Sequence, residues 1–223
     1  MTRRALDRQV TAVAWILAAV AGYVDALGFL LLQGVFTSHM TGDTAHMGRA
    51  VAAGDGAILI RFAWPIAMFV AGLFFSATIT ALGKRRGFHS TFGVALGLEA
   101  ALLFAAPVIT GYFPLAAALA GSMGIQTLTV TTAAGLRIYT TYMTGNLAKF
   151  VEGAIQFLFT GKRIELRHSI VTGGLWIFFA AGVVFGASAQ HRWGREAAIA
   201  PAMVMATVAA FDFRRPIDPA EEF

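Results

Sequence analysis

Long apolar runs separated by short polar stretches dominate the chain. A helix needs about 20 mostly apolar residues to cross a hydrocarbon core of roughly 30 Å. The runs at 11–33, 62–83, 92–136 and 169–190 are long enough. The run 92–136 exceeds one span, and the turn sequence Gly111-Tyr-Phe-Pro114 predicts its division into two helices. A shorter run at 197–211 is the sixth candidate, which we expect to tilt little or to lie partly in the interface.

Composition supports the membrane interpretation. The chain has 223 residues, of which 57% are hydrophobic and 13% are charged, so it carries more apolar surface than a soluble core of this size can bury. Cysteine is absent, which excludes disulfides and thiolate metal sites. We predict an all-α polytopic protein whose single membrane domain covers residues 1–223.

The basic residues gather in short clusters beside the apolar runs. The formal net charge of +5 would suit nucleic acid, but clusters of this kind are typical of membrane orientation, and we expect no nucleic-acid partner. Six spans place four clusters on one side, and the positive-inside rule makes that side, with both termini, cytoplasmic. Arg192 and Arg195 oppose this orientation, partly offset by Glu196. The four clusters are Arg3, Arg4 and Arg8; Lys84 to Arg86; Lys149, Lys162, Arg163 and Arg167; and Arg214 and Arg215.

A cleavable signal peptide is an alternative interpretation of the amino terminus. The arginine-rich start, the apolar stretch and Ala19-Val-Ala21 fit its pattern. We disfavour it because the apolar run continues to Gln33 and belongs to a repeat.

That repeat pairs Thr37-Ser-His-Met-Thr-Gly-Asp43 with Thr140-Thr-Tyr-Met-Thr-Gly-Asn146. Upstream, a small gap sets Tyr23-Val-Asp25 opposite Gly124-Ile-Gln126, and downstream Ala71 to Ser76 matches Ala181 to Gly186. Each half, about 11–111 and about 114–213, then holds three spans. Because three is odd, the second half enters the membrane from the opposite face, which predicts two inverted repeats of the kind found in many secondary transporters.

Two segments resemble a known family. "AGYVDALGFLLLQGVFTSHMTGDTAHMG" and "MGIQTLTVTTAAGLRIYTTYMTGNL" are similar to the two signatures of the YoaK family, six-helix bacterial membrane proteins classed as a domain of unknown function. The resemblance covers roughly residues 10–212. It implies a fold and a membrane location, and no activity. The chain departs from the family pattern at Asp43, where asparagine is expected, and at Gln126-Thr127, where Gln-Asn is expected.

The two Met-Thr-Gly motifs predict broken helices. Glycines and hydroxyl side chains interrupt a helix, and a hydroxyl or carboxylate group can cap the next one. Residues 146–159 after the second motif are amphipathic, which predicts an interfacial or re-entrant helix. The motifs serve either as structural breaks or as contacts to a solute. The candidate residues are Ser38, His39, Thr41, Gly42, Asp43, Tyr142, Thr144, Gly145 and Asn146.

Ionisable and polar groups inside the spans are further candidates. Asp25 lies within the first span and Gln126 at the matching depth of the second half, which suggests one shared site near the pseudo-symmetry axis. The alternative is a hydrogen bond that only locks helices together. Glu99 lies in the third span, where it could snorkel towards the cytoplasm or pair with Arg61.

Other chemistry has little support in the sequence. His39, Asp43 and His46 have helical spacing suited to a metal, but Tyr142, Asn146 and Lys149 occupy the equivalent positions. Two small-xxx-small patterns, Gly93 to Gly97 and Gly182 to Gly186, predict close helix packing. The chain has no motif of a hydrolase, zinc protease or nucleotide-binding enzyme, and we expect no enzymatic activity and no cofactor.

The sequence therefore predicts a transporter or permease-like protein for a small solute, coupled to protons or cations at Asp25. The alternative is a non-transporting scaffold or sensory protein whose polar centre only specifies packing. The expected partners are the bilayer and an unknown small solute or ion, and a homodimer is plausible because the helices are few and short.

Overall fold

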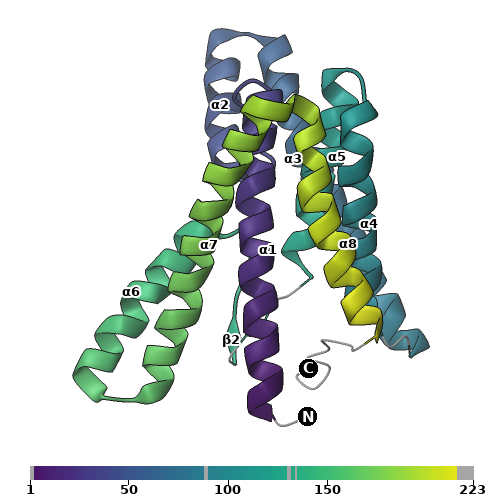
Figure 1. The fold of residues 1–223 in the computed structure, drawn as a ribbon. Coiled ribbons are helices and arrows are strands. Elements are labelled where there is room, and N and C mark those ends of the chain that lie inside the picture. The colour runs from purple at the N-terminus through teal and green to yellow at the C-terminus, as the bar shows by residue number, and fades with distance from the viewer. Residues whose placement is uncertain (1–2, 88–89, 130–131, 134, 215–223) are drawn as a thin grey trace.

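Helices make up most of this computed structural model, which describes residues 3–87, 90–129, 132–133 and 135–214 (Figure 1). In chain order the elements are α1 (Arg3–Leu31), α2 (Met40–Ala53), α3 (Gly56–Arg86), α4 (Thr91–Ala105), η1 (Ala106–Val108), α5 (Tyr112–Thr127), β1 (Thr132–Ala133), β2 (Leu136–Arg137), α6 (Met143–Thr160), α7 (Arg163–Trp193), η2 (Gly194–Ala198) and α8 (Ile199–Arg214). The all-α class is thus confirmed.

Four helical stretches in the described part of the chain are long and apolar enough to cross a membrane. They are Asp7–Leu31, Gly56–Gly83, Thr91–Val108 and Arg163–Arg214. The last stretch contains α7, η2 and α8, so it turns back within its own length. Large apolar side chains such as Phe74, Phe75 and Phe185 are more than half exposed, as expected of surfaces that face lipid.

The main helix contacts join distant parts of the chain. α1 packs along α7, α3 along α5, and α4 along α8. The backbones approach closely at glycines: a Cβ atom at Gly182 would collide with the Ala19 carbonyl oxygen, and one at Gly72 with the Gly121 carbonyl oxygen. Small residues permit such packing in lipid, where van der Waals contact replaces the hydrophobic effect between helices.

The glycine pattern corrects part of the prediction. Gly182 and Gly186 do pack closely, against Ala19 and Tyr23 of α1. Gly93 contacts the α8 region through Phe213 and Ala209, but no atom of the described residues lies within 4 Å of a Cβ at Gly97. The packing role expected of Gly97 is therefore wrong.

Hydrogen bonds join α4 to α8 at one end of this pair, and join the segments next to the two helices at the other end. At one end the Asp212 carboxylate accepts bonds from the Ser90 hydroxyl, at 2.5 Å, and the Gly93 N–H, at 2.8 Å. At the other end the Arg195 guanidinium donates to the Ile109 carbonyl at 2.5 Å. Asp212 thus satisfies backbone at the start of a helix from the other half of the chain.

A helix was expected to continue to Leu136, and this is wrong. α5 ends at Thr127, and β1 and β2 form a small antiparallel hairpin in which Thr132 pairs with Arg137 and Ala133 with Leu136. Threonines are common before the hairpin, and β-branched residues disfavour helix relative to strand. Gly135 in the hairpin has φ +75°, a left-handed conformation that suits glycine.

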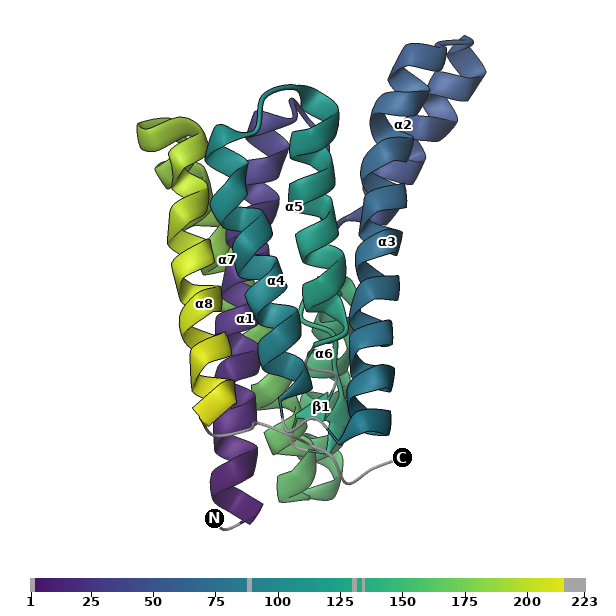
Figure 2. The same cartoon turned by 90° about the vertical axis from the view of Figure 1, so that its right-hand side faces the viewer.

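Helix ends that carry basic residues gather at one end of the molecule. The start of α1, the end of α3, the α6–α7 turn and the end of α8 lie at the lower end in both ribbon views (Figures 1 and 2). Arg215 of the fourth basic cluster lies outside the described residues. The turn between α2 and α3 lies at the opposite end.

Candidate functional site

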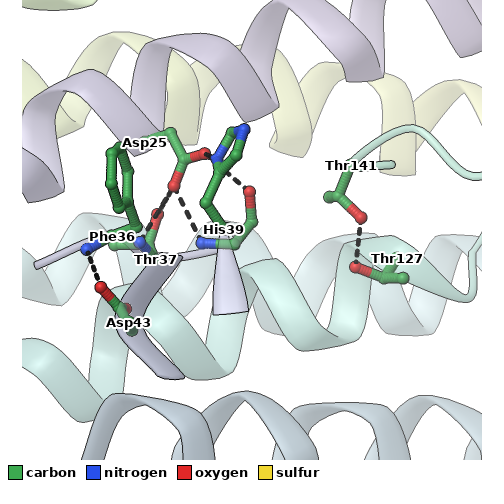
Figure 3. A network of polar contacts seen from close by, with 8 residues as sticks. Asp25, Phe36, Thr37, His39, Asp43, Thr127 and Thr141 are labelled. Atoms are coloured by element: carbon green, nitrogen blue, oxygen red, sulfur yellow. Dashed lines mark hydrogen bonds and ion pairs between the residues drawn. The ribbon is translucent and has the colours of Figure 1, made fainter. Parts of the chain in front are cut away.

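Asp25 lies on α1 and its buried carboxylate contacts the segment that forms the first helix break (Figure 3). Its Oδ1 accepts bonds from the Thr37 N–H at 2.9 Å, the Thr37 hydroxyl at 2.7 Å and the Ser38 N–H at 2.8 Å. Its Oδ2 accepts the Ser38 hydroxyl at 2.8 Å and contacts His39 Nδ1. Every polar neighbour named here can donate, so the geometry fits a carboxylate rather than a carboxylic acid.

The break exists because α1 ends early and the chain turns back along it. Gln33 has φ +54° and Gly34 φ +93°, and the Gly34 N–H bonds to the Phe29 carbonyl at 2.8 Å. Both residues adopt the left-handed conformation that ends many helices. The returning segment then brings Thr37 and Ser38 beside Asp25, which lies six positions before the end of α1.

His39 connects the buried carboxylate to the outside of the protein. Its side chain is 38% exposed, against 3% for Asp25. The hydrogen bond and the charge of Asp25 raise the pKa of His39 above its usual value of 6.5, although partial burial opposes them. The imidazole lies near the rings of Phe36 and Phe179.

Asp43, in the first turn of α2, is a second buried carboxyl group. Its Oδ1 accepts a bond from the Phe36 N–H at 3.2 Å, while its Oδ2 has no hydrogen-bond partner among the described residues (Figure 3). Burial raises its pKa from 3.8 to about 7, helped by the charge of Asp25. Asp43 lies outside the four stretches that can span a membrane.

The second break uses the same positions with uncharged groups. The Gln126 amide donates to the Thr140 hydroxyl at 3.3 Å, and the hydroxyls of Thr127 and Thr141 lie 3.0 Å apart. Asn146 donates its amide to the Tyr139 carbonyl at 2.9 Å. Asp43 and Asn146 thus both bond backbone seven residues upstream, but one accepts from an N–H and the other donates to a carbonyl.

Asp25 and Gln126 do not bond to a common partner. The Gln126 amide also donates to the Leu17 carbonyl at 2.7 Å, and Leu17 lies eight residues before Asp25. At 1.5 Å per residue this is about 12 Å along α1. The single shared site expected of the two side chains is therefore two separate hydrogen-bond networks, both of which contact α1.

The hydroxyls and glycines of the motifs have different surroundings. Ser38, Asp43 and Asn146 are buried, whereas Thr41, Tyr142, Thr144 and Gly145 are exposed and Gly42 lies under the Phe36 ring. The predicted side-chain caps are wrong, because neither α2 nor α6 has a side-chain bond from its N-cap residue. The Thr37 and Ser38 hydroxyls bond to Asp25 instead.

Glu99 is fully buried on α4, and neither carboxyl oxygen has a hydrogen-bond partner among the described residues. The expected snorkelling is therefore wrong. Pairing with Arg61 is also wrong, because the Arg61 guanidinium bonds to the Leu32 carbonyl at 2.9 Å and to Gln33 Oε1 at 3.0 Å. Glu99 remains an unsatisfied polar group in the helix bundle.

The three residues of the alternative metal site, His39, Asp43 and His46, do not lie together. His39 contacts Asp25, whereas His46 stacks on Phe62 with ring centroids 4.6 Å apart. Within the described ranges no three His, Asp or Glu side chains have an arrangement that could hold a metal ion.

Sequence reasoning named Asp25 with its partners Ser38 and His39, and it named Gln126, but it missed other partners in both networks. Thr37 bonds Asp25 and Thr140 bonds Gln126, while Thr127 and Thr141 bond each other in the second break. Their signal was present, because Thr37 and Thr140 are aligned in the repeat. Asp212 had a weaker signal, as an acidic residue directly after the last apolar run.

We expect Asp43→Asn to stabilise the protein by about 2 kcal/mol at pH 8, because an amide removes an ionised group that lacks a bond on Oδ2. The folded-state pKa of Asp43, about 7, exceeds its ordinary value of 3.8. The folded protein therefore loses the stability that protonated Asp43 contributes as pH rises from 3.8 to about 7. Between pH 5 and pH 8 the unfolding temperature should fall less in Asp43→Asn than in the wild type. His39, whose pKa is also raised, accounts for the slope that remains.

Asn146→Asp is the matched variant in the second half. It removes the donor to the Tyr139 carbonyl and places a carboxylate oxygen there, so we expect destabilisation of about 1 to 3 kcal/mol. An Asp43→Asn protein less stable than wild type at pH 8 would contradict the account of Asp43.

Comparison with known proteins gives a family and no activity. The model of the family described as "Protein of unknown function (DUF1275)" matches residues 13–211. The chain is 27% identical over 183 residues to the UPF0700 transmembrane protein YoaK of Bacillus subtilis (strain 168), covering 78% of this chain and 81% of that protein. No solved structure matches the chain. The chain belongs to the DUF1275 family of proteins of unknown function, as the two Met-Thr-Gly motifs had suggested.

Proposed function

We propose that this protein is a proton-coupled transporter for a small solute, in which the Asp25–His39 pair binds and releases the proton. The observation that carries the proposal is the buried carboxylate in contact with a half-exposed imidazole at a broken helix. Ionisable groups inside membrane proteins usually belong to ion or proton pathways. The proposed location is the bacterial inner membrane, with six spans and both termini in the cytoplasm.

An inverted repeat is part of the proposal and has three supports. α1 packs on α7 just as α5 packs on α3, so corresponding helices exchange partners between the halves. α2 follows α1 after a break, and α6 follows α5 after a break. In Figure 2, α1 rises from the lower end whereas α5 descends from the upper end. Rocking of such halves around a central site is a common transport mechanism.

Protonation would loosen the first break. The bonds from Thr37 and Ser38 are charge-assisted while Asp25 is ionised, and such bonds are roughly twice as strong as neutral ones. A proton that arrives at His39 and moves to Asp25 would weaken them together. Residues 37–39 could then separate from α1, and this is the conformational step that we assign to transport.

Proteoliposomes that contain a pH-sensitive dye provide the test. Organic anions, amino acids and organic cations are added in turn under an imposed pH gradient, and we expect at least one class to cause proton movement. Asp25→Asn should abolish this movement and His39→Gln should slow it about tenfold or more. Asp55→Asn is the control, because Asp55 bonds the Ile58 N–H at the start of α3, away from the break.

Flux that persists unchanged in Asp25→Asn would exclude the proton role. A folded protein inactive with every solute class would favour the second candidate, a scaffold or sensory membrane protein. One observation supports that candidate: Asp25 is already saturated by donors from its own chain. Asp25 lines neither the pocket beside His46 nor the pocket beside Arg61.

A further inference from the structure

A pocket of about 420 Å³ lies where the end of α1, the starts of α3 and α5, and η2 meet. This size is typical of small-ligand sites. Its charged lining residues are Arg61 of α3 and Arg195 of η2, and no acidic side chain of the described residues lines it. The pocket lies at the end of the molecule opposite the basic helix ends, where the α7–α8 turn lies in Figure 1.

Arg61 is held in place but retains free donors. Its Nη2 donates to the carbonyls of Leu32, at 2.9 Å, and Gln33, at 3.3 Å, and to Gln33 Oε1. The guanidinium carbon lies 5.1 Å from the centre of the Tyr112 ring. Its Nε is buried and has no hydrogen-bond partner among the described residues. All three of these hydrogen bonds therefore come from Nη2, which is one of the three guanidinium nitrogens.

Arg195 is similarly anchored by one nitrogen. Its Nη1 donates to the Ile109 carbonyl at 2.5 Å, which leaves Nη2 and Nε without a bond to the described residues. In this part of the chain neither arginine has a carboxylate within ion-pair distance. Glu196 is exposed and does not line the pocket, and Asp55 bonds to the Ile58 N–H. Two half-buried guanidinium groups thus share a cavity that holds no counter-ion from the part of the chain that the structure describes.

The first turn of α5 adds to the positive character of the pocket. Gly111 is the N-cap residue, has φ +91° and offers no side-chain cap, so the backbone N–H groups that follow it lack a side-chain acceptor. Gly111, Tyr112 and Phe113 all line the pocket. The amino terminus of a helix carries a partial positive charge and favours anions.

We propose that Arg61, Arg195 and the first turn of α5 form a binding site for one oxyanion, either a phosphate or a carboxylate group. Arginine forks bind such groups through paired hydrogen bonds, and both forks here leave nitrogens free. The anion could be a lipid headgroup or a free solute, since the chemistry is the same. The site does not depend on transport, because it is defined by equilibrium binding at a distance from Asp25.

Inorganic phosphate is the first probe, applied to the full-length protein stripped of lipid in detergent. Phosphate should raise the unfolding temperature in a saturable way at constant ionic strength, with chloride as the reference anion. Arg195→Gln should weaken phosphate binding at least tenfold. Arg192→Gln is the matched control, because Arg192 is an exposed arginine close by that does not line the pocket. It should bind as wild type does.

Arg61→Gln would also remove the hydrogen bonds to the end of α1, so its effect could not be assigned to the pocket alone. Ala57→Glu is therefore the second variant. Ala57 lines the pocket in the first turn of α3, where an acidic side chain is compatible with helix polarity. Ala57→Glu should place a carboxylate beside the arginines, raise the unfolding temperature without phosphate and abolish the response to phosphate.

Native mass spectrometry from nanodiscs distinguishes a lipid headgroup from a free solute as the source of the bound anion. Retention of phosphatidylglycerol over phosphatidylcholine, lost in Arg195→Gln and reduced by added phosphate, would identify a lipid headgroup. Saturable phosphate binding without lipid retention would identify a free solute. If neither anion binds, or if Arg195→Gln binds both as wild type does, the proposal is wrong.

Discussion

Asp25→Ala should destabilise the protein by about 3 to 5 kcal/mol, the effect expected when one partner of a buried charged network is removed. The alanine would leave two backbone N–H groups, two hydroxyls and the His39 ring without their acceptor. Each buried donor left without a partner costs about 1 to 3 kcal/mol. Chemical unfolding of the purified protein in detergent measures the loss, and failure to accumulate in the membrane would be its extreme form.

Two further variants extend this test, the first in the Gln126 network and the second in the Asp25 network. Gln126→Ala removes two neutral bonds in the second break, so it should cost less than Asp25→Ala. Asp25→Asn combined with His39→Gln should be less damaging than the sum of the single variants, because the double change leaves no unpaired charge. Additive losses, or an Asp25→Ala protein as stable as wild type, would refute the role given to this carboxylate.

Gly182→Ala should destabilise the protein by roughly 2 to 3 kcal/mol, since a methyl group there collides with backbone rather than with a movable side chain. The new Cβ would meet the Ala19 carbonyl and the Tyr23 backbone, so α1 and α7 would have to separate along their contact. The loss in unfolding temperature measures the effect.

Gly97→Ala is the control for this prediction. Gly97 lies in α4 with no atom of the described residues within 4 Å of the added Cβ, so the substitution should be neutral or should stabilise by up to about 1 kcal/mol through helix propensity. If Gly182→Ala were as harmless as Gly97→Ala, the close contact between α1 and α7 would not exist in the membrane.

The helix breaks were predictable because residues that lie close together in the sequence determine them. Met-Thr-Gly with flanking glycines and hydroxyl groups predicts an interruption wherever it occurs, and the structure begins α2 and α6 at Met40 and Met143. Burial of Asp25 was also predictable, since a charge within an apolar run needs partners. Ser38 and His39 were already candidates, but their bonds to Asp25 were not predictable, because the positive φ of Gln33 decides how the chain returns to α1.

Contacts between distant segments escaped the sequence analysis for a physical reason. Charge alone suggested that Glu99 might meet Arg61, but the Arg61 guanidinium bonds to the end of α1 and packs on Tyr112. Small-xxx-small spacing marks surfaces that allow close approach without naming the partner. It therefore identified Gly182 and Gly186 correctly and Gly97 incorrectly.

The exchange of helices between the two halves has a consequence for biogenesis. Gly22 of α1 packs against Phe179 of α7, a residue made more than 150 positions later. At about 5 to 20 residues per second a ribosome needs roughly 10 to 30 s to synthesise that stretch. During this interval the helices synthesised before α7 lie in the bilayer without their final neighbours. Nascent chains of this protein should therefore depend on insertion factors that shield polar membrane segments until translation is complete.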